Sequence, residues 1–118
     1  MHDKRRFPRL MKAESLSLTV IAAPGVAAAQ GEKFYCESVD VSAAGLRVIA
    51  DRDVAGDTRV EIWLVLLEDR ETFLLQGKVS WCEPAKDEQG EARYLLGVQL
   101  LPVADSDFDR WAAKFLES

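Results

Sequence analysis

Basic side chains are concentrated at the start of this chain. They are Lys4, Arg5, Arg6, Arg9 and Lys12, and Pro8 stiffens the turn before Arg9. The arginine fork donates two parallel hydrogen bonds to O6 and N7 of guanine or to phosphate oxygens, and its plane stacks on a base. The segment therefore suits a guanine nucleotide, and it also has the composition of a solvated tail.

A second set of polar residues, Asp40, Ser42 and Gly45, follows an apolar stretch further along the chain. A carboxylate accepts hydrogen bonds from N1 and the exocyclic amine of guanine, a serine hydroxyl binds phosphate, and a glycine lets the backbone approach a ligand. The same spacing is typical of an Asx or Ser turn closed by a glycine at positive φ. Both interpretations stay open on these residues alone.

The elements that must position these residues are predicted from the periodicity of apolar side chains. Period-two alternation and β-rich runs predict a β protein. Apolar residues near the C-terminus recur at helical spacing instead, from Phe108 through Trp111 to Phe115 and Leu116. We expect strands at residues 12–21, 33–41, 46–49, 59–67, 72–82 and 94–101, with a hairpin loop at residues 83–92. The predicted fold is mainly β, a six-stranded antiparallel barrel closed by a C-terminal helix.

Charge divides the chain into a basic arm and an acidic body. The net charge is −5, of which residues 1–12 contribute +4 and the rest −9. With 118 residues, the chain has room for one domain and one core. We therefore expect an arm at residues 1–12, mobile and basic, a barrel at 13–103 and a helical segment at 104–118.

Several classes of site and location are disfavoured by composition. Cys36 and Cys82 lie far apart and His2 is the sole histidine, so no metal-ligand spacing and no Cys/His catalytic pair is expected. We predict free thiols, no cofactor, no metal and no enzymatic activity. The apolar stretch at residues 16–29 is interrupted by polar residues and by a Pro-Gly pair, which favours a cytoplasmic protein without membrane insertion.

Taken together, the two polar motifs resemble the signature of the PilZ domain family. That family carries R-x-x-x-R, matched by Arg5 and Arg9, and [D/N]-x-S-x-x-G, matched by Asp40, Ser42 and Gly45. The stretches 77–81 and 94–98 look like the penultimate and last strands of the family. The resemblance covers about residues 4–117.

The resemblance implies a bacterial receptor for the second messenger cyclic di-GMP. By position, Arg5 and Arg9 would contact guanine bases and phosphates with help from Arg6. Asp40 would read a guanine edge, Ser42 would bind a phosphate or base, and Gly45 would allow close packing. Trp81 is a further candidate for stacking on the ligand, and a plain core tryptophan is the alternative.

The number of bound ligands stays open. In the family, the residue before R-x-x-x-R influences whether one cyclic di-GMP or an intercalated pair is bound, and here that residue is Lys4. A long cation suits a pair, which is the favoured stoichiometry, but lysine lacks the planar fork of arginine.

The implied mechanism is that the ligand bridges the arm to the barrel and orders the arm. The resulting surface would act in trans on a protein effector that the sequence does not name. One alternative is a PilZ module that binds proteins without the nucleotide. Another is a nucleic-acid binder that uses the basic arm, although the acidic body would repel a long polyanion.

Overall fold

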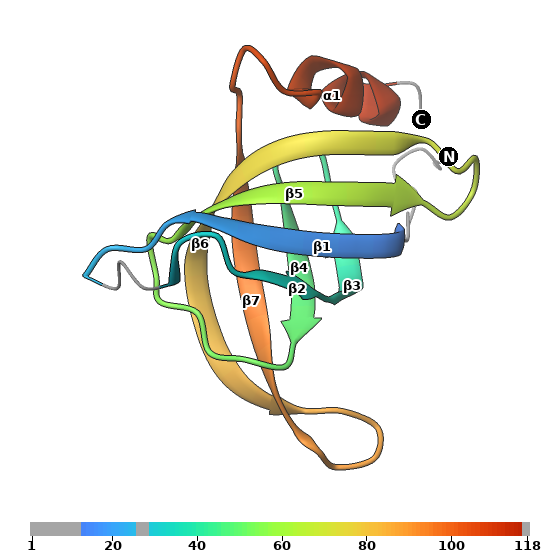
Figure 1. The fold of residues 1–118 in the computed structure, drawn as a ribbon. Helices are drawn as coiled ribbons and strands as arrows, with labels where there is room; N and C mark the ends of the chain where they lie inside the picture. Colours follow the sequence, from blue (N-terminus) through green and yellow to red (C-terminus); the bar gives the residue numbers. More distant parts are fainter. Residues whose placement is uncertain (1–12, 26–28, 117–118) are drawn as a thin grey trace, which may run out of the picture.

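The strands of this computed structural model form one antiparallel sheet that curls around a shared apolar core (Figure 1). The structure describes residues 13–25 and 29–116. In chain order, the elements are β1 (Ala13–Ala22), β2 (Lys33–Tyr35), β3 (Glu37–Val41), β4 (Gly45–Ala50), β5 (Arg59–Leu66), β6 (Thr72–Lys86), β7 (Ala92–Leu101) and α1 (Phe108–Leu116). The order across the sheet is β2-β1-β5-β6-β7-β4-β3. The predicted class, mainly β with one C-terminal helix, is confirmed.

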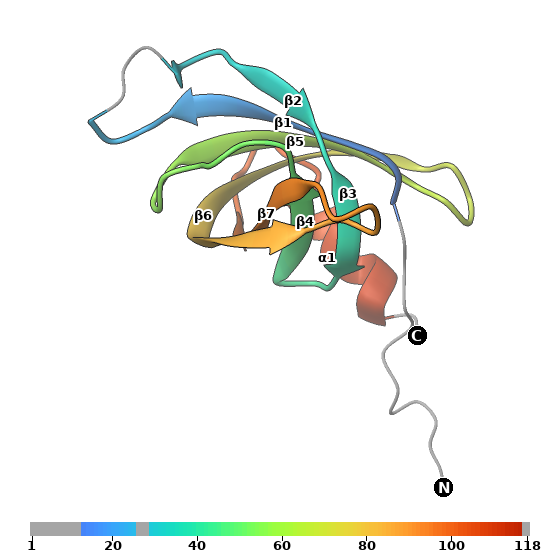
Figure 2. The same ribbon diagram turned by 90° about the horizontal axis from the view of Figure 1, so that it is seen from below.

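The described strands number seven instead of six because the strand predicted at residues 33–41 is divided at Cys36. Its first part, β2, pairs with β1, where Tyr35 lies opposite Ser17. Its second part, β3, pairs with β4 at the other end of the sheet. At the division, the Cys36 N–H donates to the Leu16 carbonyl over 3.0 Å. One continuous segment therefore joins the two ends of the sheet, which Figure 2 shows from below as a curled, barrel-like layer.

Side-chain alternation along β5 settles which residues of this apolar strand form the core. The even-numbered residues from Val60 to Leu66 are buried and face inward. Trp63 and Leu67 are 45% and 53% exposed, so the apolar run at the end of the strand divides between core and surface. This division follows from the pleat of a strand, which sends successive side chains to opposite faces.

The hairpin formed by β6 and β7 is longer than the sequence pattern predicts. The loop expected at residues 83–92 is wrong in extent, because β6 continues to Lys86 and β7 begins at Ala92. Proline is unusual within a strand, yet Pro84 pairs with Tyr94 inside the ladder. Beyond Lys78, which lies opposite Arg59, β6 has no pairing with β5, so the missing N–H of Pro84 falls at an open edge. The hairpin projects below the other strands in Figure 1.

Helix α1 covers one end of the curled sheet and is fixed there by Trp111, which is 0% exposed. The Trp111 ring packs edge-to-face against Phe73 and Phe115, with ring centroids 5.1 Å apart in both pairs. Its indole Nε1–H donates to the Ser42 carbonyl over 2.9 Å. The helix is therefore tied directly to the turn between β3 and β4.

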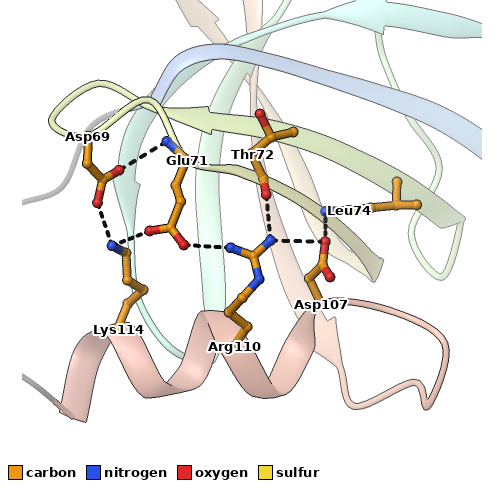
Figure 3. Close-up of polar contacts among 7 residues, drawn as sticks. All are labelled: Asp69, Glu71, Thr72, Leu74, Asp107, Arg110 and Lys114. Atoms are coloured by element: carbon orange, nitrogen blue, oxygen red, sulfur yellow. Dashed lines mark hydrogen bonds and ion pairs between the residues drawn. The ribbon is translucent and has the colours of Figure 1, made fainter.

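A chain of charged groups holds the exposed side of α1 to the hairpin between β5 and β6 (Figure 3). Lys114 pairs with Asp69 and Glu71, and Arg110 donates to Glu71 and to the Thr72 carbonyl over 2.6 Å each. The Leu74 N–H donates to Asp107. The ammonium of Lys114 lowers the pKa of the Asp69 carboxyl, and the two carboxylates raise the pKa of Lys114. The cations of α1 are thus each shared among several acceptors.

Candidate functional site

Asp40, Ser42 and Gly45 lie together at the turn between β3 and β4. The Ser42 N–H donates to the Gly45 carbonyl over 2.8 Å, and the Gly45 N–H donates to Ser42 Oγ over 3.2 Å. The motif therefore forms a serine-closed turn, as one of the two sequence interpretations predicts. The expected positive φ at Gly45 is wrong. A glycine is needed because a Cβ there would lie 2.7 Å from the Val98 carbonyl oxygen of β7.

Asp40 lies directly opposite Arg47 across the β3–β4 ladder. The Arg47 Nε–H donates to both carboxylate oxygens, over 3.0 Å and 3.2 Å, and Nη2 donates to Oδ2 as well. The two side chains are 41% and 49% exposed. The guanidinium lowers the pKa of the Asp40 carboxyl, so the carboxylate is ionised and open to solvent.

The ladder continues from Arg47 to Gly97 of β7 and from Gly97 to Trp81 of β6. A Cβ at Gly97 would lie 2.2 Å from Trp81 Cε2, so the indole ring lies directly over the glycine backbone. Trp81 is 39% exposed, which excludes the alternative of a plain core tryptophan. We call Asp40, Arg47, Gly97 and Trp81 the cross-strand row.

The cross-strand row and the motif turn border one shallow depression of about 350 Å³. The depression offers a carboxylate, a guanidinium, a serine hydroxyl and an aromatic ring on one outward-facing surface. These are the groups that accept from, donate to and stack on a purine base. The lining residues are Asp40, Ser42, Ala44, Gly45, Leu46, Arg47, Ser80, Trp81, Gly97, Val98 and Gln99.

The other predicted site residues, Lys4, Arg5, Arg6 and Arg9, lie outside the described residues. The described chain begins beside the motif, because the Ala13 N–H donates to Ser38 Oγ over 3.2 Å. Ser38 precedes Asp40 by two positions on β3. The start of β1 is therefore attached to the strand that carries the motif.

Arg47 was missed in the sequence, although a signal for it exists. The sequence motif ends at Gly45, so the motif alone does not indicate the charged residue two positions later. A tight turn at residues 42–45 pairs the residues that flank it. Val41 therefore lies opposite Leu46, and Asp40 lies opposite Arg47. The register of a hairpin closed by this motif therefore predicts that Asp40 and Arg47 are paired.

A larger hollow of about 630 Å³ lies beside the β6–β7 hairpin and contains none of the predicted site residues. Tyr35, Ile49 and Glu88 are among its lining residues, and its Arg93 pairs with Asp87 over 3.2 Å. The depression at the cross-strand row is smaller but holds the motif. Chemistry rather than volume therefore identifies the candidate site.

Cys36 and Cys82 are free thiols in the structure, as predicted. Burial raises the pKa of Cys36 to about 12, and burial also raises the pKa of Cys82. Within residues 13–25 and 29–116, no cluster of three metal-ligating side chains occurs. Among the same residues, no helix has the length and apolar character needed to cross a membrane.

Comparisons with known proteins agree with this fold. The sequence matches the model described as PilZ domain over residues 3–116. K. pneumonia MrkH is similar in structure, with a TM-score of 0.62 and 15% identity, over 99% of this chain and 49% of MrkH. Its apo state gives a TM-score of 0.59 at 15% identity, over 99% of this chain and 51% of that one. This chain thus spans about half the length of MrkH.

A second similar structure is the PilZ domain of YcgR from Escherichia coli with c-di-GMP. Its TM-score is 0.61 at 13% identity, over 97% of this chain and 91% of that domain. No curated protein matches the sequence. Because the family model spans residues 3–116 and includes both motifs and the cross-strand row, the chain belongs to the PilZ domain family.

Proposed function

We propose that this chain is a cytoplasmic receptor for cyclic di-GMP, which binds between the N-terminal arm and the cross-strand row. The observation that carries the proposal is the exposed, ionised Asp40 carboxylate beside the Ser42–Gly45 turn. Membership of the PilZ family supports it. The similar YcgR domain, whose structure is with c-di-GMP, gives the ligand its identity.

Each described residue of the proposed site has a distinct task. Asp40 accepts from the N1–H and 2-amino group of a guanine. Ser42, whose hydroxyl sits at the turn, binds a phosphate or base, and Gly45 keeps that turn close to β7. Trp81 offers an exposed ring face on which a base can stack.

The arm supplies the cations in this proposal. Arg5 and Arg9 contact guanine and phosphate, and Lys4 and Arg6 assist. Reach supports this role, since four residues of extended chain span at most about 14 Å and Arg9 precedes Ala13 by four positions. The hydrogen bond from Ala13 to Ser38 holds the start of β1 against β3, two positions before Asp40.

The response to the ligand in this proposal is ordering of the arm, residues 1–12, on the barrel at 13–103. The described residues are acidic, with 18 Asp and Glu against 10 Lys and Arg between positions 13 and 116. A dianionic ligand therefore needs the arm as its counter-charge, and the arm and ligand together form a new surface. We propose that a protein effector reads this surface in trans.

The test is isothermal titration of the protein with cyclic di-GMP, repeated on Arg5→Ala and Asp40→Ala. We expect saturable binding by the wild type and at least about a tenfold loss in each variant, because each change removes charge-assisted hydrogen bonds. Arg93→Ala and Asp105→Ala are the matched controls and should bind as the wild type does. The same titration gives the stoichiometry, for which two is the expected value.

The other outcomes of this titration are also informative. No heat and no saturation with the wild type would contradict the receptor and favour a protein-binding PilZ module. Binding of oligonucleotides with steep salt dependence and no preference for guanine would favour a nucleic-acid binder.

A further inference from the structure

The pair formed by Asp40 and Arg47 has the hydrogen-bonding pattern of the two edges of a guanine. Arg47 presents two N–H donors, from Nε and Nη2, to the two carboxylate oxygens of Asp40. Guanine presents two adjacent donors, N1–H and the 2-amino group, on one edge. On the next edge it presents two adjacent acceptors, O6 and N7. One guanine can therefore bind Asp40 in place of Arg47 and, at the same time, bind Arg47 in place of Asp40.

The pair is also inexpensive to open. Both side chains are close to half exposed, and exposed ion pairs contribute at most about 1 kcal/mol. Asp40 and Arg47 lie on neighbouring strands of a fixed ladder, so their backbones stay in place when the side chains part. On the side of Arg47 away from Asp40, the Trp81 ring covers Gly97 and forms a flat aromatic surface that borders the depression.

We propose that Arg47 determines the specificity of this site by binding the O6 and N7 edge of the guanine that Asp40 holds by N1 and the 2-amino group. This inference rests on the proposed function. The base enters between the two side chains, and the bonds that joined Asp40 to Arg47 are exchanged for bonds to the ligand. Because the ligand must satisfy both partners, the ion pair of the free protein acts as a filter.

Adenine fails this filter at both sides of the pair. It carries an amino group where guanine has O6, so its N7 edge presents a donor beside an acceptor to Arg47. It also lacks the N1–H and 2-amino donors that Asp40 needs. An adenine ligand would therefore separate the ion pair without replacing its hydrogen bonds.

The experiment combines a change in the protein with a change in the ligand. Wild type and Arg47→Met are titrated with cyclic di-GMP and with its 7-deaza analogue, in which N7 is replaced by carbon. Met keeps the aliphatic stem of the arginine and removes the fork. Arg47→Lys keeps the charge and serves as the second variant, and thermal melting confirms that both variants fold. Arg93→Met is the matched control, since Arg93 on β7 is also paired with an aspartate, Asp87 in the loop between β6 and β7.

We expect Arg47→Met to bind cyclic di-GMP about tenfold more weakly than the wild type, and Arg47→Lys to recover only part of the loss. For the 7-deaza ligand, the loss caused by Arg47→Met should be smaller, because one of the two bonds is already absent. Arg93→Met should bind both ligands as the wild type does.

Two results would overturn the inference while the receptor itself stands. The first is wild-type affinity in Arg47→Met. The second is that Arg47→Met loses affinity equally for both ligands, which would show that Arg47 does not bind N7 of the guanine. Failure of the wild type to bind cyclic di-GMP would instead contradict the proposed function, so the two failures are distinguishable.

Discussion

Two tryptophans mark regions of the molecule that use similar residues for different purposes. Trp111 is fully buried beneath α1 and packs against two phenylalanines. Trp81 lies over Gly97 on the outer surface of the sheet and is 39% exposed. An arginine bound to carboxylate lies near each of them, Arg110 beside α1 and Arg47 in the cross-strand row.

The surroundings of the two arginines explain the difference. Arg110 donates to Glu71 and to a backbone carbonyl, and it pairs with Asp107. Its guanidinium carbon, Cζ, lies 4.1 Å from the centroid of the Phe73 ring. Within residues 13–25 and 29–116, the Arg47 side chain hydrogen-bonds only to the exposed Asp40. An arginine that is shared among a carboxylate, a carbonyl and a ring fastens elements together. One that rests on a single exposed carboxylate can exchange that partner for a ligand.

The largest expected effect separates the two tryptophans by stability. Trp111→Ala should lower the free energy of unfolding by about 3 to 5 kcal/mol, since it empties the core beneath α1 and frees the Ser42 carbonyl. Trp81→Ala should lower it by less than about 1 kcal/mol. Urea denaturation of both variants measures the contrast. Similar losses in both would mean that Trp81 is part of the core.

Gly97→Ala tests whether the row needs Trp81 in its observed place. The added methyl would overlap the indole, so the ring must move, at a cost of about 1 to 3 kcal/mol in stability. We expect a shift of the Trp81 indole signal in the NMR spectrum and weaker binding of cyclic di-GMP. An unmoved indole signal would show that the ring does not fill this position in solution.

Lys114→Met probes the fastening of α1 through its pH dependence. The lowered pKa of Asp69 means that the ionised pair stabilises the fold above the ordinary aspartate pKa of about 3.9. That stabilisation is lost as pH falls through the lowered value. The variant should therefore melt a few degrees below the wild type at pH 7, and the gap should close in acid. A gap that persists at pH 2 would assign the effect to the aliphatic stem of Lys114.

The smallest expected effect concerns Asp40, whose pKa is lowered by Arg47. Binding that needs the ionised carboxylate should persist below pH 4 in the wild type. In Arg47→Met, the carboxyl titrates nearer its ordinary pKa, and binding should fade at a higher pH. Titrations of cyclic di-GMP between pH 3 and 6 measure the displacement. Coincident profiles would show that Arg47 does not control the ionisation of Asp40.

Much of the fold can be predicted from the local sequence pattern. Where the structure differs from the prediction, the cause is contact between segments far apart in the chain. Alternation along β1 and the β-rich apolar run of β5 identify both strands, because each strand buries apolar side chains in the core. The break at Cys36 carries no local signal, since it results from closure of the sheet. Pro84 reads as a loop residue from sequence, and only the open edge of β6 permits it to lie in a strand.

The candidate site was predicted in part for the same reason. Asp40, Ser42 and Gly45 are adjacent in sequence, so the motif is visible without the fold. Arg47 and Gly97 join them through strand pairing, which spacing along the chain does not express. The requirement for glycine at position 45 comes from the carbonyl of Val98, a residue far along the chain.

The divided strand also bears on how the molecule reaches its native state. Its two halves dock on β1 and β4, whose other partners are β5 and β7, so pairs such as Leu18 with Ile62 and Val48 with Leu96 are remote in sequence. Contacts of this kind close long loops before they gain stability, and proteins dominated by them fold in roughly milliseconds to seconds. The segment that joins the two ends of the sheet can pair fully only after β1 and β4 are both in place. We therefore expect closure of the sheet at Cys36 to come late in folding.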